Sequence, residues 1–549
     1  MTSRILPLTT ICLILFLSRP IRGAVATSSR PPQPVLITGQ TAPGLGDFEL
    51  SSFLDSAIND LGHVVINGRE EDPQVTGSGR WALYAGPVGN IRAVVREGDS
   101  LPGFPFNTGE VESIGSLAAI DPLGQVSFNA RVSGPSISQY ENEGLWTEVD
   151  GELQLVLKEG TSFLGVDPSV HFNTSTAGVL QSGDYRLWLA FNSNPDIPPE
   201  QRSRRTLWFS SGDTASLIAL GGEVPDRSVG VSPREATYSR FARQALNASG
   251  QFVVTGTINA PIASTLINDI LYTNVDGEFV ALVQESDSLP SPYSGDFDEV
   301  GSANINNAGT IVFQTTLNLT EPDDAIFVYE HGEFRAVAFD GQVAPGVAQP
   351  AEFETFGSPV INATGLIAFP ATTDDGQPFT DDKEGIWIER DETLELVVAS
   401  DVPVPGYEDL GQFRSFDTPA MNDDGQIAFT ASFGLDSRGS RSIWATDKLG
   451  NLHLIARQGQ LVDVDPSPHR EDWRQIHSLF FEDETGGEDG RSSGFNNRGQ
   501  VVFRADFREG GAGIFLSNAA AVIPEPSGFV LAIFGIGACF GLRRSAQLS

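Results

Sequence analysis

The first residues to consider are those whose spacing could support catalysis. Gly490-Arg491-Ser492-Ser493-Gly494 matches the G-x-S-x-G pattern, in which a serine nucleophile stands on a tight turn between a strand and a helix and meets a histidine. Here the pentapeptide lies in a polar, acidic stretch that precedes a strand-like run, with no helical pattern after it. We therefore interpret it as a loop.

Neither the histidines nor the acidic clusters have the spacing of a metal site. The histidines are scattered and form no H-E-x-x-H pattern. Two acidic clusters offer oxygen ligands that suit calcium, but neither has the order of a calcium loop, and we interpret both as solvated loops. We predict no catalytic residue, cofactor or metal, with calcium as the alternative. The histidines are His63, His171, His331, His453, His469 and His477, and the clusters are Asp374-Asp375 with Asp381-Asp382-Glu384 and Glu482-Asp483-Glu484 with Glu488-Asp489.

The composition narrows the classes of function. The chain has 34 basic and 71 acidic residues among 549, a net charge of −37, so its surface repels nucleic acid, and we predict no such partner. A hydrophobic content of 40% is enough for a packed core. The two cysteines, Cys12 and Cys539, lie in apolar runs near the two ends, so the chain between them has no thiol for a disulfide, a metal or a nucleophile.

One pattern recurs between those ends: an apolar residue, Asn, two variable residues, Gly and a strand-like run that usually contains Phe. The gap from Gly124 to Gly250 is twice the usual spacing, which predicts an eighth, degenerate copy with a turn near Gly183 and a strand at 187–191. The clear copies are Asn59 with Gly62, Asp121 with Gly124, Asn247 with Gly250, Asn306 with Gly309, Asn362 with Gly365, Asn422 with Gly425, and Asn496 with Gly499.

The Asn-x-x-Gly pattern predicts a tight turn between two antiparallel strands. The Asn side-chain oxygen can cap its own turn, and Gly adopts the positive φ that closes a type I turn with a bulge. A residue that recurs in every copy is usually structural, and a ligand site rich in asparagine is the alternative interpretation.

Two further strand-like runs follow each turn, so one copy is a four-stranded meander. The third run carries an aromatic residue, such as Trp146, Trp387 or Trp444, and the fourth alternates and leads to a linker with Pro and Gly. The second run is apolar on both faces, so both faces must be covered. The sequence therefore predicts an all-β fold, a β-propeller of eight four-stranded blades over residues 35–521.

The predicted ring lacks one strand at its C-terminal end and has one to spare at its N-terminal end. The last copy stops after Gly513-Ile514-Phe515-Leu516, and an alternating run from Val35 to Ile37 has no repeat before it. We predict that these two runs pair and close the ring, which hides the sheet edges that favour aggregation.

Two longer excursions interrupt the repeat, at 192–205 and 459–494. The second carries Trp473, Arg474 and His477 among acidic residues. Since loops on a rigid scaffold commonly carry binding residues, we expect any specific site in this excursion.

The N-terminal end has the pattern of a secretory signal peptide. Arg4 precedes the apolar run 5–17, and small residues follow at Ala24 and Ala26. We predict a signal peptide at 1–26, with cleavage after Ala26 or, alternatively, Ala24, and a linker at 27–34.

The C-terminal end, 522–549, has the pattern of a sorting or anchor segment. Pro524-Glu525-Pro526 precedes the apolar run 528–542, for which we predict a helix, and paired arginines follow it. That run would rise about 22 Å, short of the ~30 Å hydrocarbon layer. Basic residues after an apolar run hold that end on the cytoplasmic side. The two arginines are Arg543 and Arg544.

This tail resembles the PEP-CTERM sorting signal of bacterial exported proteins, and the repeats resemble bacterial Asn-x-x-Gly-x-x-x-Phe tandem-repeat proteins with various surface anchors. The resemblance implies processing by an exosortase-type membrane enzyme and an association with exopolysaccharide and biofilm matrix. It implies membrane attachment only through 528–542.

These observations predict an exported protein, displayed at the cell surface or associated with extracellular matrix, that has a binding or structural role. The alternative is an extracellular polysaccharide-active enzyme, a glycosidase or lyase, because the axial pocket of a propeller can hold paired carboxylates.

Overall fold

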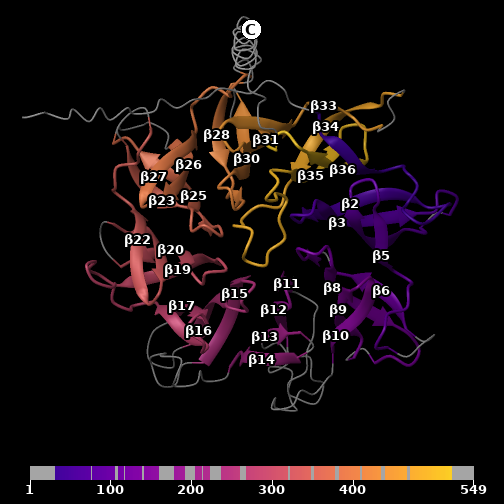
Figure 1. Ribbon diagram of the computed structural model, residues 1–549, viewed down its shortest axis with the longest axis horizontal. Helices are drawn as coiled ribbons and strands as arrows, with labels where there is room; N and C mark the ends of the chain where they lie inside the picture. The colour runs from indigo at the N-terminus through magenta and orange to yellow at the C-terminus, as the bar shows by residue number, and fades with distance from the viewer. Residues whose placement is uncertain are drawn as a thin grey trace, which may run out of the picture.

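The computed structural model describes residues 31–521 apart from 76, 105–108, 116–117, 139–140, 160–178, 192–204, 213, 223–236, 260–267, 319–321, 348–350, 377–382, 408–410, 435–438 and 466–469. In this part of the chain, eight antiparallel sheets surround a central axis (Figure 1). The predicted eight-bladed β-propeller is confirmed. Within the described residues, nothing forms a helix with the length and hydrophobicity that a membrane span needs.

The blades are numbered in chain order, and each begins with its inner strand except blade 8, in which β33 precedes the inner strand β34. Blade 1 contains β2 (Glu49–Ile58), β3 (His63–Glu71), β4 (Arg80–Pro87) and β5 (Arg92–Arg96). Blade 2 contains β6 (Glu110–Ile114), β7 (Ala119–Ile120), β8 (Val126–Ser133), β9 (Glu143–Val149) and β10 (Glu152–Lys158). Blade 3 contains β11 (Val179–Ser182), β12 (Tyr185–Phe191), β13 (Arg205–Ser211) and β14 (Thr214–Leu220). Blade 4 contains β15 (Thr237–Leu246), β16 (Phe252–Asn259), β17 (Asn268–Thr273) and β18 (Val280–Gln284).

The other half of the ring repeats this arrangement. Blade 5 contains β19 (Phe297–Ile305), β20 (Ile311–Leu317), β21 (Asp324–Glu330) and β22 (Glu333–Phe339). Blade 6 contains β23 (Glu352–Phe356), β24 (Val360–Ile361), β25 (Ile367–Asp374), β26 (Lys383–Arg390) and β27 (Thr393–Ala399). Blade 7 contains β28 (Gln412–Phe416), β29 (Ala420–Met421), β30 (Ile427–Gly434), β31 (Ser440–Thr446) and β32 (Leu452–Arg457). Blade 8 contains β33 (Leu461–Asp463), β34 (Trp473–Phe480), β35 (Val501–Phe507), β36 (Ala512–Ser517) and β1 (Gln33–Ile37).

The hydrophobic core lies between neighbouring blades, because the middle strands are apolar on both faces. In blade 2, Phe128 on β8 and Trp146 on β9 are both fully buried, with ring centroids 6.1 Å apart. The Trp146 indole Nε1 also donates a 3.0 Å bond to the carbonyl of Pro102, and Trp387 does the same to Pro345. The aromatic strand thus holds the proline linker that leads into its own blade.

The degenerate copy forms blade 3. Its turn passes through Gly183, where φ is +58°, and β11 pairs with β12 up to Ser182 and Tyr185. The predicted run 187–191 is the second strand of this blade. The doubled spacing between glycines therefore located a blade that has lost the Asn-x-x-Gly residues.

The N-terminal strand closes the ring, as predicted. Strand β1 pairs antiparallel with β36, with Leu36 opposite Ile514 and Ile37 opposite Gly513. The strand starts at Gln33, two residues inside the segment that we expected to be a linker.

Blade 8 differs from the prediction at its inner strand. We expected a strand immediately before Asn496, and Phe495 does pair with Val501 there. The inner strand is interrupted, however: β34 comes first, and residues 481–494 then leave the blade and enter the centre of the ring (Figure 1). The predicted excursion at 459–494 therefore contains the strands β33 and β34 as well as a segment at the axis. Strand β34 ends at Phe480, so residues 481–494 separate it from the turn at Asn496, where the repeat pattern places the inner strand.

Candidate functional site

Each repeat asparagine closes its own turn through its side-chain oxygen. In blade 8, Asn496 Oδ1 accepts bonds from the backbone N–H groups of Arg498 at 3.1 Å and Gln500 at 3.0 Å. Gly499 adopts a φ of +72° and donates its N–H to the Asn496 carbonyl at 2.9 Å. This positive φ is why glycine occupies the fourth position of the turn.

The other half of each amide links one blade to the next. The Nδ2 group donates to the backbone oxygen of the equivalent turn residue in the following blade. An aspartate could cap the turn but could not donate this bond. The bonds run from Asn59 to Asp121 (2.8 Å), Asn247 to Asn306 (2.8 Å), Asn306 to Asn362 (3.1 Å), Asn362 to Asn422 (2.9 Å), Asn422 to Asn496 (3.2 Å) and Asn496 to Asn59 (2.9 Å). We call this series the asparagine belt.

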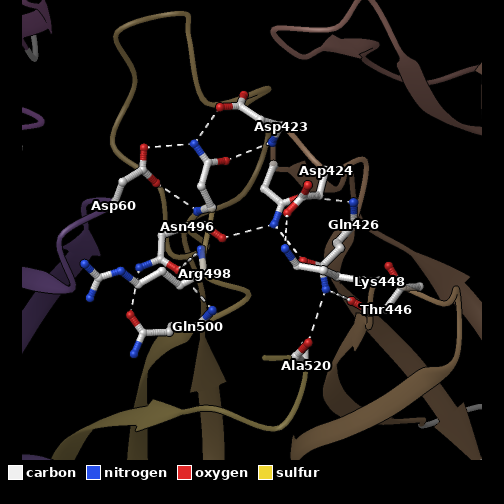
Figure 2. A network of polar contacts seen from close by, with 12 residues as sticks. Asp60, Asp423, Asp424, Gln426, Thr446, Lys448, Asn496, Arg498, Gln500 and Ala520 are labelled. Atoms are coloured by element: carbon white, nitrogen blue, oxygen red, sulfur yellow. Dashed lines mark hydrogen bonds and ion pairs between the residues drawn. The ribbon is translucent and has the colours of Figure 1, made fainter. Parts of the chain in front are cut away.

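A second layer of polar contacts reinforces the belt where the ring closes (Figure 2). Asn497 Nδ2 donates to Asp60 Oδ2 of blade 1 at 2.9 Å and to Asp423 Oδ2 of blade 7 at 2.6 Å. Gln426 Nε2 donates to the carbonyls of Thr446 at 2.8 Å and Ala520 at 3.2 Å. Blades 7, 8 and 1 are thereby joined by side chains as well as by β1.

The belt is interrupted where blade 2 carries aspartate. Asp121 accepts the two turn-capping bonds, and burial raises the pKa of its carboxyl although these backbone donors oppose the rise. Arg186 of blade 3 reaches back to blade 2 instead, donating to Ser127 Oγ at 3.3 Å and Thr147 Oγ1 at 3.0 Å. This interface is held by a guanidinium in place of an amide.

Residues 482–494, which we call the axial segment, lie in the centre of the ring. The segment meets the ends of the inner strands of blades 7, 6, 5, 4, 3, 2 and 1 in that order, opposite to the direction of the chain. Backbone oxygens of Thr485, Asp489, Gly490 and Ser493 accept bonds from the N–H groups of Met421 (2.8 Å), Leu246 (2.8 Å), Gln181 (3.1 Å) and Ile58 (2.8 Å), respectively. Ser492 Oγ donates to the Ala118 carbonyl at 3.1 Å, and Asn304 Nδ2 donates to Asp489 Oδ2 at 2.7 Å.

Blade 6 meets the segment at Gly486. A Cβ atom at this position would overlap the backbone oxygen and carbon of Ile361, the residue before the turn asparagine of that blade. Only glycine allows the two backbones to approach this closely.

Asp489 anchors the segment and is fully buried. Besides Asn304, its carboxylate accepts bonds from the Thr485 hydroxyl at 2.6 Å and the Arg491 N–H at 3.2 Å. The Arg491 guanidinium donates to the backbone oxygens of Glu484 at 2.8 Å and Gln244 at 3.1 Å. A buried charge needs such partners. The bonds of Asp489 and Arg491 therefore explain how an acidic segment can lie at the axis.

Two neighbouring carboxyls of the segment have pKa values near neutrality. Burial raises the pKa of Glu482 to about 7, with a contribution from Asp55 that the Arg504 guanidinium opposes. Burial raises the pKa of Asp483 to about 7 as well, and Asp417 adds to the effect. The interpretation of this cluster as a solvated loop was therefore wrong, because these side chains lie against the inner strands.

Little space remains beside these carboxyls. The cavity next to Glu482 has a volume of about 20 Å³ and is lined by Asp55, Asn67 and Ser492 among others. A cavity of this size holds about one water molecule. Ser492 belongs to the G-x-S-x-G match, and its hydroxyl is occupied by the Ala118 carbonyl in a segment that contains no strand-to-helix turn.

The structure brings no metal-ligating group together in the part of the chain that it describes. His453 is buried against Asp447, with Nε2 3.0 Å from Oδ2, whereas His331 and His477 are exposed. His171, His469, Asp381 and Asp382 lie outside the described residues. The same is true of the cleavage residues Ala24 and Ala26 and of the sorting residues Pro524, Glu525, Pro526, Arg543 and Arg544.

Sequence reasoning missed the belt donors and the axial segment. The only sequence signal for the segment is the wider spacing between Gly425 and Gly499 than between other neighbouring turn glycines. For the belt, the signal is the recurrence of asparagine at a position where aspartate or serine could equally cap a turn.

A family model described as "Family of unknown function (DUF7453)" matches residues 19–183 and 182–530. The chain belongs to this family. Membership in DUF7453 assigns no activity, and no curated protein matches the sequence.

Several solved structures are similar to this DUF7453 chain in fold alone. The β-propeller domain of the Trilobed protease from Pyrococcus furiosus is 10% identical, with a TM-score of 0.38 and 74% of this chain and 98% of that chain covered. An acylaminoacyl peptidase in complex with Z-Gly-Gly-Phe-chloromethyl ketone is 11% identical, with a TM-score of 0.36; 74% of this chain is covered, and the match spans about half of that chain, 52%. The polysaccharide lyase Uly1 is 8% identical, with a TM-score of 0.33 and coverage of 77% and 94%.

Proposed function

We propose that this chain is an exported protein, displayed at the cell surface or held in extracellular matrix, whose propeller acts as a rigid binding or structural scaffold. One observation carries the proposal: the axial segment occupies the centre of the ring, where a propeller has its central channel. An axis occupied by the chain itself supports a role for the outer surfaces of the ring.

The bonds around the axis support rigidity. The asparagine belt, the β1 strand and the axial segment each join blades that are distant in the sequence. They supply this cross-linking in a stretch without cysteine. The net charge of −37 favours solubility outside the cell.

The proposed location rests on the resemblance of the two ends to sorting signals. A signal peptide at 1–26 would export the chain, and the tail 522–549 would present it to an exosortase-type enzyme. Exopolysaccharide is the partner that this resemblance favours.

The test compares binding with turnover on the same protein. Purified full-length chain is applied to a glycan array, and the same preparation is incubated with polysaccharides while reducing ends and unsaturated products are measured. We expect binding without turnover. Catalytic release of shorter saccharides would contradict the scaffold proposal.

A polysaccharide-active enzyme remains the second candidate because of one observation. The Glu482 and Asp483 carboxyls have pKa values of about 7, which suits general acid catalysis at neutral pH. The cavity of about 20 Å³ beside Glu482 is too small for a sugar, so catalysis by Glu482 in that cavity requires the axial segment to move. Glu482→Gln and Asp483→Asn variants separate the candidates: an enzyme loses turnover, whereas a scaffold keeps its glycan binding.

A further inference from the structure

An open pocket of about 380 Å³ lies between blades 7 and 8, and the belt and axial segment do not involve it. It is lined by Gln458, Gly459, Gln475, Ile476, His477 and Arg508. In the antiparallel meander, links between blades lie on the face opposite the Asn-x-x-Gly turns. The link into blade 8 runs through β33, which pairs with the inner strand β34. We call this the blade 7–8 pocket.

The pocket is cationic in a strongly acidic protein. Its lining contains no carboxylate, although the chain carries a net charge of −37. Arg508 donates one bond, from Nη1 to Gln475 Oε1 at 3.1 Å, and forms no ion pair among the described residues. Arg457, next to Gln458, likewise has no ion pair there. Some other arginines pair with carboxylates, as Arg335 does with Glu389.

His477 adds a second group that faces solvent. Its side chain is exposed, and Gln458 Nε2 donates to its backbone oxygen at 2.7 Å. The Arg508 guanidinium keeps most of its N–H groups for a ligand, and a guanidinium fork matches a carboxylate in two parallel bonds. This end of the pocket therefore fits a carboxylate.

An aromatic platform lies beside the pocket on the same strand. Trp473 is 53% exposed and precedes Gln475 by two residues on β34, so the two side chains project from the same face of the strand. Its Nε1 donates to Glu471 Oε2 at 2.9 Å, which fixes the edge of the indole. An exposed indole face packs against the C–H face of a sugar ring, and nearby carboxylates accept sugar hydroxyls.

We propose that the blade 7–8 pocket binds an acidic saccharide, with a uronate carboxylate at Arg508 and His477 and a neighbouring ring against Trp473. This inference rests on the proposed function and names the class of ligand for it. Glu471 and Asp463 beside Trp473 disfavour ligands with charge along their whole length, such as nucleic acid.

Isothermal titration of the full-length chain tests the inference. The acidic probe is a tetrasaccharide that alternates glucuronate with N-acetylglucosamine, and the neutral probe is the tetrasaccharide of N-acetylglucosamine. We expect the acidic probe to bind about tenfold more tightly than the neutral one, because charge-assisted bonds are the stronger ones. Arg508→Gln should remove that difference, and Trp473→Ala should weaken binding of both probes.

The matched control is Arg240→Gln, since Arg240 is an exposed arginine on β15 of blade 4, on the opposite side of the ring. This variant makes the same change in net charge and should bind like wild type. Three results would refute the proposed saccharide binding at the pocket: no binding of the acidic probe, wild-type affinity in Arg508→Gln, or equal losses of affinity in Arg508→Gln and Arg240→Gln. None of these results would contradict the scaffold proposal. Cleavage of either probe would instead contradict the scaffold.

Discussion

Asn496 of blade 8 donates its side-chain amide to the backbone oxygen of Asn59 in blade 1 across 2.9 Å, although 437 positions separate the two residues. The same amide oxygen caps the Asn496 turn. One side chain therefore shapes a local turn and closes the ring. Strand β1 closes the same junction through backbone pairing with β36.

Replacing Asn496 with aspartate separates these two roles. Asn496→Asp keeps both acceptor bonds of the turn but loses the donor to Asn59. It also places a carboxylate oxygen against the backbone oxygen of Asn59. We expect a loss of about 1 to 3 kcal/mol in the free energy of unfolding. Urea titration measures it, with the exposed Asn318→Asp as the control. Equal stability of the two variants would show that the belt contributes nothing.

The raised carboxyl pKa values predict a pH dependence of stability. Glu482 and Asp483 have pKa values of about 7 in the folded chain, above their ordinary values of 4.5 and 3.8. The folded state therefore holds more protons than the unfolded state between about pH 4 and 7, so stability should fall across that range and level off above it.

Unfolding midpoints at pH 5 and pH 8 measure this effect. The Glu482→Gln and Asp483→Asn double variant should be more stable than wild type at pH 8 and should show a smaller difference between the two pH values. Glu333→Gln, on an exposed position of β22, should leave the difference unchanged. A double variant with the full wild-type pH dependence would refute the assignment.

Gly486 provides a test of the contact with blade 6. Gly486→Ala places a Cβ on the Ile361 backbone, so either the segment or the strand must shift. We expect a loss of about 1 to 3 kcal/mol, as for other overpacked positions. Gly46→Ala, where a Cβ meets nothing within 4 Å, serves as the control. If both variants unfold at the wild-type midpoint, the axial segment is not seated as described.

Removal of β1 should expose a sheet edge. A chain that lacks residues 27–38 loses the partner of β36, from Leu516 to Gly513. Unpaired edges recruit other chains, so we expect oligomers or aggregates in light scattering after size exclusion. A monodisperse, equally stable monomer would contradict the role of β1 in closure.

Local and periodic features could be predicted from the sequence. The turn glycines and the apolar second strands recur at fixed spacings, so they predicted eight blades. The run at 35–37 has no repeat before it, and it predicted the closure of the ring. The degenerate turn at Gly183 followed from spacing alone. These features needed no knowledge of which blade faces which.

Features that depend on how blades face one another could not be predicted. The donor bond from Asn496 to Asn59 requires the register between two blades, which no local pattern contains. The axial segment is not periodic, and its acids look solvated until the Asn304 amide and the Arg491 guanidinium are placed beside Asp489. The axial segment separates strand β34 from its turn at Asn496, so this strand does not stand where the repeat pattern places an inner strand.

Hydrogen–deuterium exchange of the full chain tests the central claim that the axial segment fills the ring in solution. The amides of Ile58, Leu246 and Met421 donate to backbone oxygens of this segment. We predict slow exchange at these three amides, and fast exchange when residues 483–493 are replaced by a short glycine-rich link. Fast exchange at all three amides in the unaltered chain would contradict the account.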